Sequence, residues 1–146
     1  MRREHTDPAK MALIRSLPAF ESASKADLVR LAAALDIVDV PVGTTLTTEG
    51  RFGRDLMVVV AGTATATRAG RLAGRAGPGE LIGEQAVLDG VPRNATVVAD
   101  TPMRLLVAGP AVADELVRMI RALPVLAEAV ARRRANDVPG AALAPT

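Results

Sequence analysis

The residues whose types and spacing could do chemistry lie in one segment, residues 79–99. Gly83 permits a tight turn and a close approach of the backbone to a ligand. The five residues 84–88 predict a single helical turn, in which the backbone N–H groups of Gln85 and Ala86 have no acceptor within the helix. The start of a helix that presents such groups favours anions. This segment therefore predicts an anion site built largely from backbone.

Two charged residues stand at either end of the predicted turn. Arg93 comes at the start of the next expected strand and can fold back toward the same N–H groups, where a guanidinium would bind one phosphate. Glu84 can accept a hydrogen bond from a neighbouring hydroxyl. A phosphate beside a hydroxyl describes the sugar–phosphate unit of a nucleotide. The alternative is that Glu84 and Arg93 form a structural ion pair that braces the turn.

The other basic residues are explained without a bound ligand. The three arginines 132–134 are expected to offset the dipole at a helix C-terminus rather than to bind nucleic acid. The glycine-rich stretch 70–79 lacks the Lys-Ser/Thr ending of a phosphate loop and is expected to be a hairpin connection. A further set is expected to lie scattered over turns and to serve solubility: Arg51, Arg54, Arg68, Arg71 and Arg75.

Composition excludes several classes of function. The 146 residues suit one domain, and the chain has no Cys, Trp or Tyr and a single histidine, His5. Thiol chemistry, stacked-aromatic sites and the multi-histidine metal site of a cupin-type enzyme therefore lack their residues, and we expect no catalytic residue and no metal. The net charge of +2 is too balanced for a nucleic-acid partner. Without a signal peptide or a long apolar run, we expect a cytoplasmic protein with no membrane partner. Heavy use of Ala, Arg, Gly and Val with almost no Lys is typical of a bacterial source.

The elements that must position these residues are mainly β, with helices on either side. Apolar spacing predicts helices over 8–16 and 24–35, the second capped by Ser24. Short β-prone runs between glycines predict an antiparallel β-roll or jelly roll. The expected strands include 36–42, 44–48, 56–60, 63–67, 71–75, 94–99 and 103–107. Helical spacing returns over 112–123 and 125–134.

Taken together, the segment resembles the phosphate-binding cassette of cyclic nucleotide-binding domains, such as those of cyclic-AMP-dependent kinase regulatory subunits and catabolite activator-type proteins. The family pattern is matched by Ile82-Gly83-Glu84 and, eight residues after Glu84, by the run that opens with Pro92-Arg93. The resemblance extends beyond the cassette. It includes Leu17-Pro-Ala-Phe20, the helix over 24–35, Val42-Gly-Thr-Thr-Leu46, Glu49-Gly50 and the strand that begins at Leu56.

The resemblance implies a ligand site. Glu84 would accept a hydrogen bond from the ribose 2′-hydroxyl, and Arg93 would pair with the cyclic phosphate. The N–H groups of Gln85 and Ala86 would be further phosphate donors, with Gly83 as the turn residue. Asn94 stands where the family has a small residue, and it would bond the phosphate or the base, or crowd them. In the family the last helix swings over the bound base, and this movement transmits the signal; the equivalent helix here would be 125–134. No aromatic residue stands where it would cap the base.

The sequence thus predicts a regulatory module that binds cyclic AMP, or less favourably cyclic GMP, without chemistry. The expected organisation is an N-terminal extension over 1–10, the binding domain over 11–135 and a disordered tail over 136–146. Because only the tail follows the last expected helix, output is expected through an unknown protein effector or a homodimer. The alternative is an interaction or dimerisation module that keeps the fold and has lost the ligand.

Overall fold

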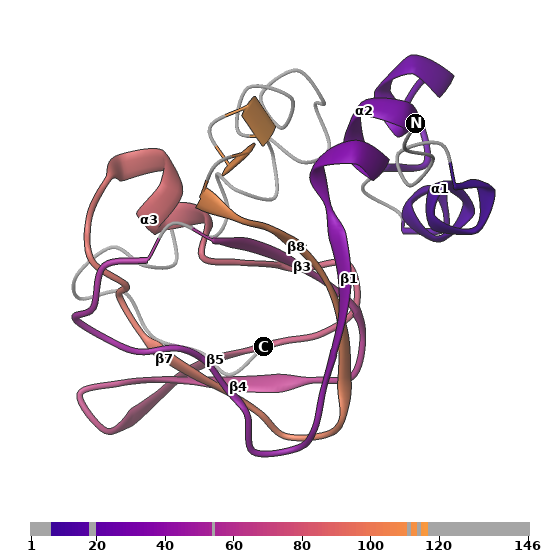
Figure 1. Ribbon diagram of the computed structural model, residues 1–146. Helices are drawn as coiled ribbons and strands as arrows, with labels where there is room; N and C mark the ends of the chain where they lie inside the picture. Colours follow the sequence, from indigo (N-terminus) through magenta and orange to yellow (C-terminus); the bar gives the residue numbers. More distant parts are fainter. Residues whose placement is uncertain (1–6, 18–19, 54, 111, 114, 117–146) are drawn as a thin grey trace.

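A computed structural model describes residues 7–17, 20–53, 55–110, 112–113 and 115–116 (Figure 1). Two helices, α1 (Pro8–Arg15) and α2 (Lys25–Ala34), precede the strands. The helix α2 begins as expected, because the Ser24 side chain accepts from the Asp27 N–H while the Asp27 carboxylate accepts from the Ser24 N–H. The expected helices over 112–123 and 125–134, and the tail, lie wholly or mostly outside the described residues.

The described strands form two antiparallel sheets of four strands each. The first has the order β1-β8-β3-β6 and the second the order β2-β7-β4-β5, which confirms the predicted β-roll. The strands are β1 (Asp36–Val40), β2 (Thr45–Thr47), β3 (Leu56–Ala61), β4 (Ala64–Arg68), β5 (Arg71–Ala76), β6 (Leu81–Ile82), β7 (Thr96–Ala99) and β8 (Met103–Ala108). A third helix, α3 (Glu84–Asp89), joins β6 to the loop before β7.

Two predicted boundaries differ from the structure. The strand expected over 71–75 is confirmed as β5, which pairs with β4, so the hairpin connection expected over 70–79 is confined to the residues on either side of that strand. The strand expected to start at Asn94 starts at Thr96. The residues just before it bond to other parts of the chain, as described below, and so leave the strand ladder.

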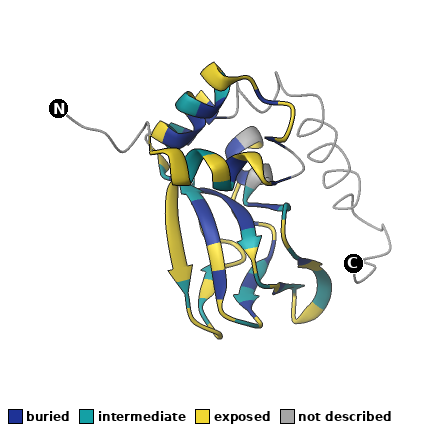
Figure 2. Cartoon of the chain, turned by 90° about the vertical axis from the view of Figure 1, so that its right-hand side faces the viewer, coloured by how far each residue is buried: buried dark blue, intermediate teal, exposed yellow. Residues whose placement is uncertain are grey.

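The core has two parts, one on each face of the first sheet. On one face, β3 and β8 pack against α1 and α2, with Phe20, Leu31 and Leu106 almost fully buried. On the other face, inside the roll, β3 and β8 meet the smaller alanine and valine side chains of the second sheet. Figure 2 shows that the buried residues concentrate on the central strands, whereas β1 is mostly exposed. The strand β3 is well buried: Leu56, Met57, Val58 and Val59 are each at most 5% exposed.

An exposed ion pair joins two neighbouring strands of the first sheet, β1 and β8. Arg104 on β8 donates from Nε to Oδ1 of Asp39 on β1 at 2.8 Å, and from Nη2 to Oδ2 at 3.0 Å. The hydrogen bond from Arg104 holds the pKa of Asp39 below its ordinary value of 3.8. The same contact raises the pKa of Arg104. Because the pKa of Asp39 is lowered on folding, its stabilising effect is full above pH 3.8 and disappears as the pH falls through the lowered pKa.

The variant Asp39→Asn is therefore expected to change the free energy of unfolding only slightly at neutral pH, because both side chains are largely exposed. The difference between the two proteins should shrink further below pH 3.8. Chemical denaturation at neutral and at acid pH measures both differences. A variant whose deficit grows in acid would contradict the assignment.

Candidate anion site at the start of α3

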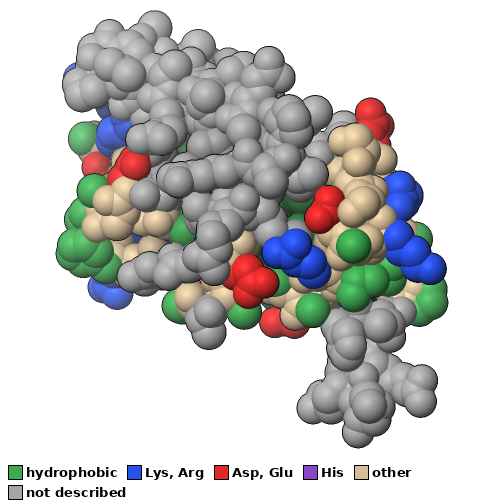
Figure 3. All heavy atoms as spheres, turned by 90° about the horizontal axis from the view of Figure 1, so that it is seen from above, with side chains coloured by type: hydrophobic (Ala, Val, Ile, Leu, Met, Phe, Trp, Pro, Cys, Tyr) green, Lys and Arg blue, Asp and Glu red, His purple; other side chains and the backbone are tan. Residues whose placement is uncertain are grey.

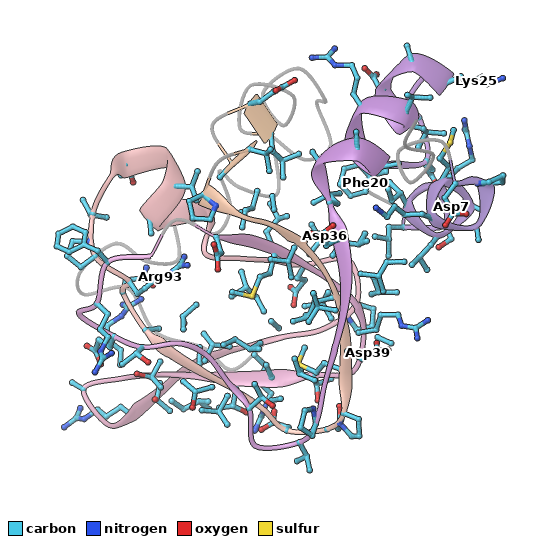
Figure 4. All side chains as sticks on the ribbon, viewed as in Figure 1. Asp7, Phe20, Lys25, Asp36, Asp39 and Arg93 are labelled. Atoms are coloured by element: carbon cyan, nitrogen blue, oxygen red, sulfur yellow. The ribbon has the colours of Figure 1, made fainter. Side chains whose placement is uncertain are left out.

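The side chain of Arg93 lies against the start of α3. It is 8% exposed, although arginine is usually a surface residue. Its Nη1 donates to the carbonyl of Gly83 at 3.3 Å, and its Nη2 donates to the carbonyl of Asp55 at 3.1 Å. Figure 4 shows Arg93 near α3, on the side of the molecule away from α1 and α2. The guanidinium therefore ties the start of α3 to the residue that precedes β3.

Two glycines make the space that the guanidinium fills. A Cβ atom at Gly53 would lie 2.7 Å from Nε of Arg93 and 2.8 Å from Nη2. A Cβ atom at Gly83 would overlap Nη1 of Arg93 and lie 2.8 Å from the carbonyl oxygen of Asp55. All of these contacts are under 3.0 Å, which real Cβ atoms essentially never show, so neither glycine position accepts a side chain unless a neighbouring group moves. We call this space the Gly53–Gly83 slot.

Replacing Gly53 by alanine is expected to displace the Arg93 guanidinium, because the new methyl group would occupy the slot. Only a side chain must move, so the fold should be kept. Ligand affinity should fall by roughly 10-fold, which corresponds to about 1.4 kcal/mol. A matched control is Gly74→Ala on β5, where nothing lies within 4 Å of the new Cβ. Titration of both variants with the same nucleotide makes the comparison, and equal affinities would contradict the slot.

The helix α3 is flanked at both ends by glycines in the left-handed backbone conformation. Gly83 caps its start with φ +92°, and Gly90 ends it with φ +64°. The N–H of Gly90 donates to the carbonyl of Ala86 at 2.9 Å. Val87 is 7% exposed and packs into the core cluster that holds α1 and α2. The helix is thus anchored through one face.

The predicted site residues on α3 are described in part. The backbones of Glu84 and Gln85 form the first turn, so the N–H groups of Gln85 and Ala86 have no acceptor within the helix. Ala86 itself is buried. The side chains of Glu84 and Gln85 lie outside the described part of the chain. The predicted contact of Glu84 with a hydroxyl, and its alternative ion pair with Arg93, therefore stay predictions.

The backbone around Arg93 is held by the loop that follows β2. The N–H of Arg93 donates to the carbonyl of Arg51 at 2.8 Å, and the N–H of Gly50 donates to the carbonyl of Arg93 at 2.9 Å. Asn94 is exposed, and its carbonyl accepts from Nε of Arg68 at 2.9 Å. The hydroxyl of Thr47 donates to the carbonyl of Ala95 at 3.0 Å. Residues 93–95 thus use their backbone groups for these bonds, and β7 begins only at Thr96.

Sequence reasoning missed three contributors. Gly53 appeared only as one of many turn glycines, and the carbonyl of Asp55 carries no side-chain signal. Arg68 was expected on a turn as a solubility residue, but it ends β4 and donates to Asn94. The only sequence signal near Gly53 was the Glu49-Gly50 pair, which is part of the family resemblance. It does not indicate which residues the loop contacts.

Figure 3 shows acidic and basic side chains interspersed on the visible face. Within the described ranges, no three His, Cys, Asp or Glu residues are placed to hold a metal ion. None of the helices in those ranges is long and apolar enough to cross a membrane.

The residues of this site lie inside a match to a known family. A family model described as the cyclic nucleotide-binding domain matches residues 37–119, which include Gly53, Gly83 and Arg93. Over 94 residues the chain is 34% identical to a cyclic nucleotide-gated potassium channel of Mesorhizobium japonicum. That match covers 64% of this chain but only 26% of the channel, so the chain spans about a quarter of that relative's length.

Solved structures agree on the fold. The N-terminal domain of a transcriptional regulator from Streptomyces coelicolor is 32% identical, with a TM-score of 0.61, and the match covers 88% of this chain and 94% of that one. The regulatory domain of Toxoplasma gondii protein kinase A, crystallised with cAMP, is 26% identical, with a TM-score of 0.63 and coverages of 92% and 50%. The family match covers more than half of the chain and contains the whole Arg93 site. The chain belongs to the cyclic nucleotide-binding domain family.

Proposed function

We propose that the chain is a regulatory module that binds a cyclic nucleotide, with cyclic AMP preferred over cyclic GMP. The observation that carries this proposal is the buried guanidinium of Arg93, which lies against the start of α3 inside the span that the family model matches. A cyclic phosphate bound there would accept hydrogen bonds from the guanidinium and from the N–H groups of Gln85 and Ala86. Such charge-assisted bonds are about twice as strong as neutral ones.

The remaining contacts follow the family resemblance. Glu84 would accept from the ribose hydroxyl, Gly83 would allow the close approach of the backbone, and Asn94 would lie beside the ligand. The preference for cyclic AMP is supported by the Toxoplasma gondii relative, whose structure contains that nucleotide. The ligand would be bound reversibly, without a chemical step.

Signal output through the C-terminal helices is part of the same proposal. Val87 of α3 belongs to the core cluster that also contains Ala113 and Leu116, which follow β8. A ligand that moves α3 would therefore change the packing around Ala113 and Leu116, and through them the position of the C-terminal helices. Binding would then shift the equilibrium between two arrangements of the helices. The effector would be another protein or a second copy of this chain.

A second candidate function has one observation in its favour. The guanidinium of Arg93 already donates to two backbone carbonyls, so it can serve as a brace between α3 and β3. Under this alternative the chain is an interaction or dimerisation module that keeps the fold and binds no nucleotide.

Amide chemical shifts in an NMR titration with cyclic AMP distinguish the two candidates. The proposal expects saturable shifts centred on Gly83, Gln85, Ala86 and Asn94, with smaller ones at β1 and at the turn between β7 and β8. The same titration with cyclic GMP should require higher concentrations. Saturable shifts centred elsewhere would contradict the site, and no shifts with either nucleotide would favour the brace.

A further inference from the structure

The turn between β4 and β5 contains an unfavourable backbone conformation. Arg68 pairs with Arg71 across it, so Ala69 and Gly70 form a two-residue turn. Ala69 has φ +52° and is the one non-glycine residue with positive φ in the described part of the chain. An alanine in the left-handed region is disfavoured by about 1–2 kcal/mol. Such a conformation persists where its surroundings hold it, and it often marks a functional region.

Two hydrogen bonds hold this turn, and both lead to the segment around Arg93. The N–H of Ala69 donates to Oε1 of Glu49 at 3.0 Å. Beside it, Nε of Arg68 donates to the carbonyl of Asn94 at 2.9 Å. We call the pair of bonds, Glu49–Ala69 and Arg68–Asn94, the hairpin clamp. It connects residues that lie 20 and 26 positions apart in the chain.

The clamp holds the two segments that enclose Arg93. Glu49 directly precedes Gly50, whose N–H donates to the carbonyl of Arg93. Asn94 directly follows Arg93. In addition, the N–H of Glu49 donates to the hydroxyl of Thr96 at 3.0 Å, which ties the two segments to each other. The backbone of Arg93 is therefore fixed from both sides by one strand hairpin.

We propose that Glu49 and Arg68 are positioning residues that hold Arg93 in place for binding of the cyclic phosphate. The inference rests on the proposed function. Neither side chain needs to touch the ligand, because each acts through the backbone beside Arg93. A guanidinium held in its binding geometry loses less conformational freedom when the ligand arrives, and affinity rises accordingly. The turn at Ala69 is the part of the hairpin from which both bonds of the clamp are donated.

The first test uses the chain without ligand. Hydrogen exchange of the Gly50 and Arg93 amides, read by NMR, reports directly on the bonds that fix the Arg93 backbone. In Glu49→Ala and in Arg68→Met, exchange at these two amides should be faster by roughly 3- to 10-fold, as expected for the loss of one coupled contact. Exchange in β3 should be unchanged. Glu49→Gln should stay near the wild-type rates, because its amide oxygen can still accept from Ala69.

The second test measures affinity for cyclic AMP by calorimetry. Glu49→Ala and Arg68→Met should each weaken binding by roughly 3- to 10-fold. In an Arg93→Met background the same substitutions should change affinity by less than about 2-fold, because the residue that they position is gone. Matched controls are Asp100→Ala, which loses an exposed bond from the hydroxyl of Thr65, and Arg104→Met, which loses the pair with Asp39. Both controls should bind as the wild type does.

The outcomes separate the clamp from the proposed function. If the wild-type chain binds no cyclic nucleotide, the proposed function fails, and the positioning role for a cyclic phosphate falls with it, whatever the exchange rates are. If the wild type binds but exchange at Gly50 and Arg93 is unchanged in the variants, the clamp is wrong. If exchange accelerates and affinity does not fall, or falls equally in the Arg93→Met background, the two residues are structural only and the proposal is overturned.

Discussion

Replacing Arg93 by methionine is expected to weaken binding of cyclic AMP by roughly 30-fold or more, which corresponds to about 2 kcal/mol or more. The guanidinium is the charged partner of the cyclic phosphate in the proposed site, and its position is fixed by the carbonyls of Gly83 and Asp55. Methionine keeps an apolar stem of similar length in the buried position. Loss of affinity would therefore report the lost charge rather than a collapsed site. Calorimetric titration gives the two dissociation constants.

Two controls make this result specific. Arg104→Met removes the same charge from β8, where the guanidinium contacts Asp39 instead of the site, so its affinity should match the wild type. Thermal unfolding should show that Arg93→Met remains folded with a lower midpoint, because the carbonyls of Gly83 and Asp55 lose their donors. A folded Arg93→Met protein with wild-type affinity would show that the phosphate does not bind at Arg93.

Replacing Gly83 by alanine is expected to lower both the stability and the affinity of the protein. The residue has φ +92°, where an L-residue with a side chain is strained by about 1–2 kcal/mol. The new methyl group would also meet Nη1 of Arg93 and the carbonyl oxygen of Asp55. Because that oxygen is backbone, relief requires movement of the chain. We expect the free energy of unfolding to fall by about 2–4 kcal/mol, measured by chemical denaturation.

The other end of the same helix provides a matched control. Gly90 also has positive φ, but a Cβ there would meet nothing within 4 Å. Gly90→Ala should therefore show the backbone strain alone, about 1 kcal/mol, with little effect on affinity. Equal losses of stability and affinity in the two variants would contradict the contact of Gly83 with the Arg93 guanidinium.

Local signals in the sequence predicted much of the fold. Ser24 followed by Asp27 is a capping pattern that acts within one turn, and the helix begins there. The run from Leu56 is apolar and β-branched, and it forms the buried strand β3. The helical turn predicted after Gly83 is α3, and Gly83 at its start has the positive φ that glycine allows. Each of these features depends on residues close together in the chain, which is why the sequence alone could indicate them.

The parts of the site that depend on distant contacts could not be predicted. Gly53 matters because Arg93 fills the space beside it, forty residues later in the chain. The carbonyl of Asp55 accepts from Arg93 whatever side chain it carries. Arg68 contacts Asn94 because β4 lies next to β7 in the second sheet. No periodicity or local motif records such pairings, so they become visible only when the strands are placed.

The central claim, that this chain binds a cyclic nucleotide at Arg93, is tested most directly by calorimetric titration of the purified wild-type chain with cyclic AMP. Our account predicts a single saturable site with a dissociation constant in the micromolar range or below. It is contradicted if a chain that unfolds cooperatively on heating shows no saturable binding of cyclic AMP or cyclic GMP up to millimolar concentration.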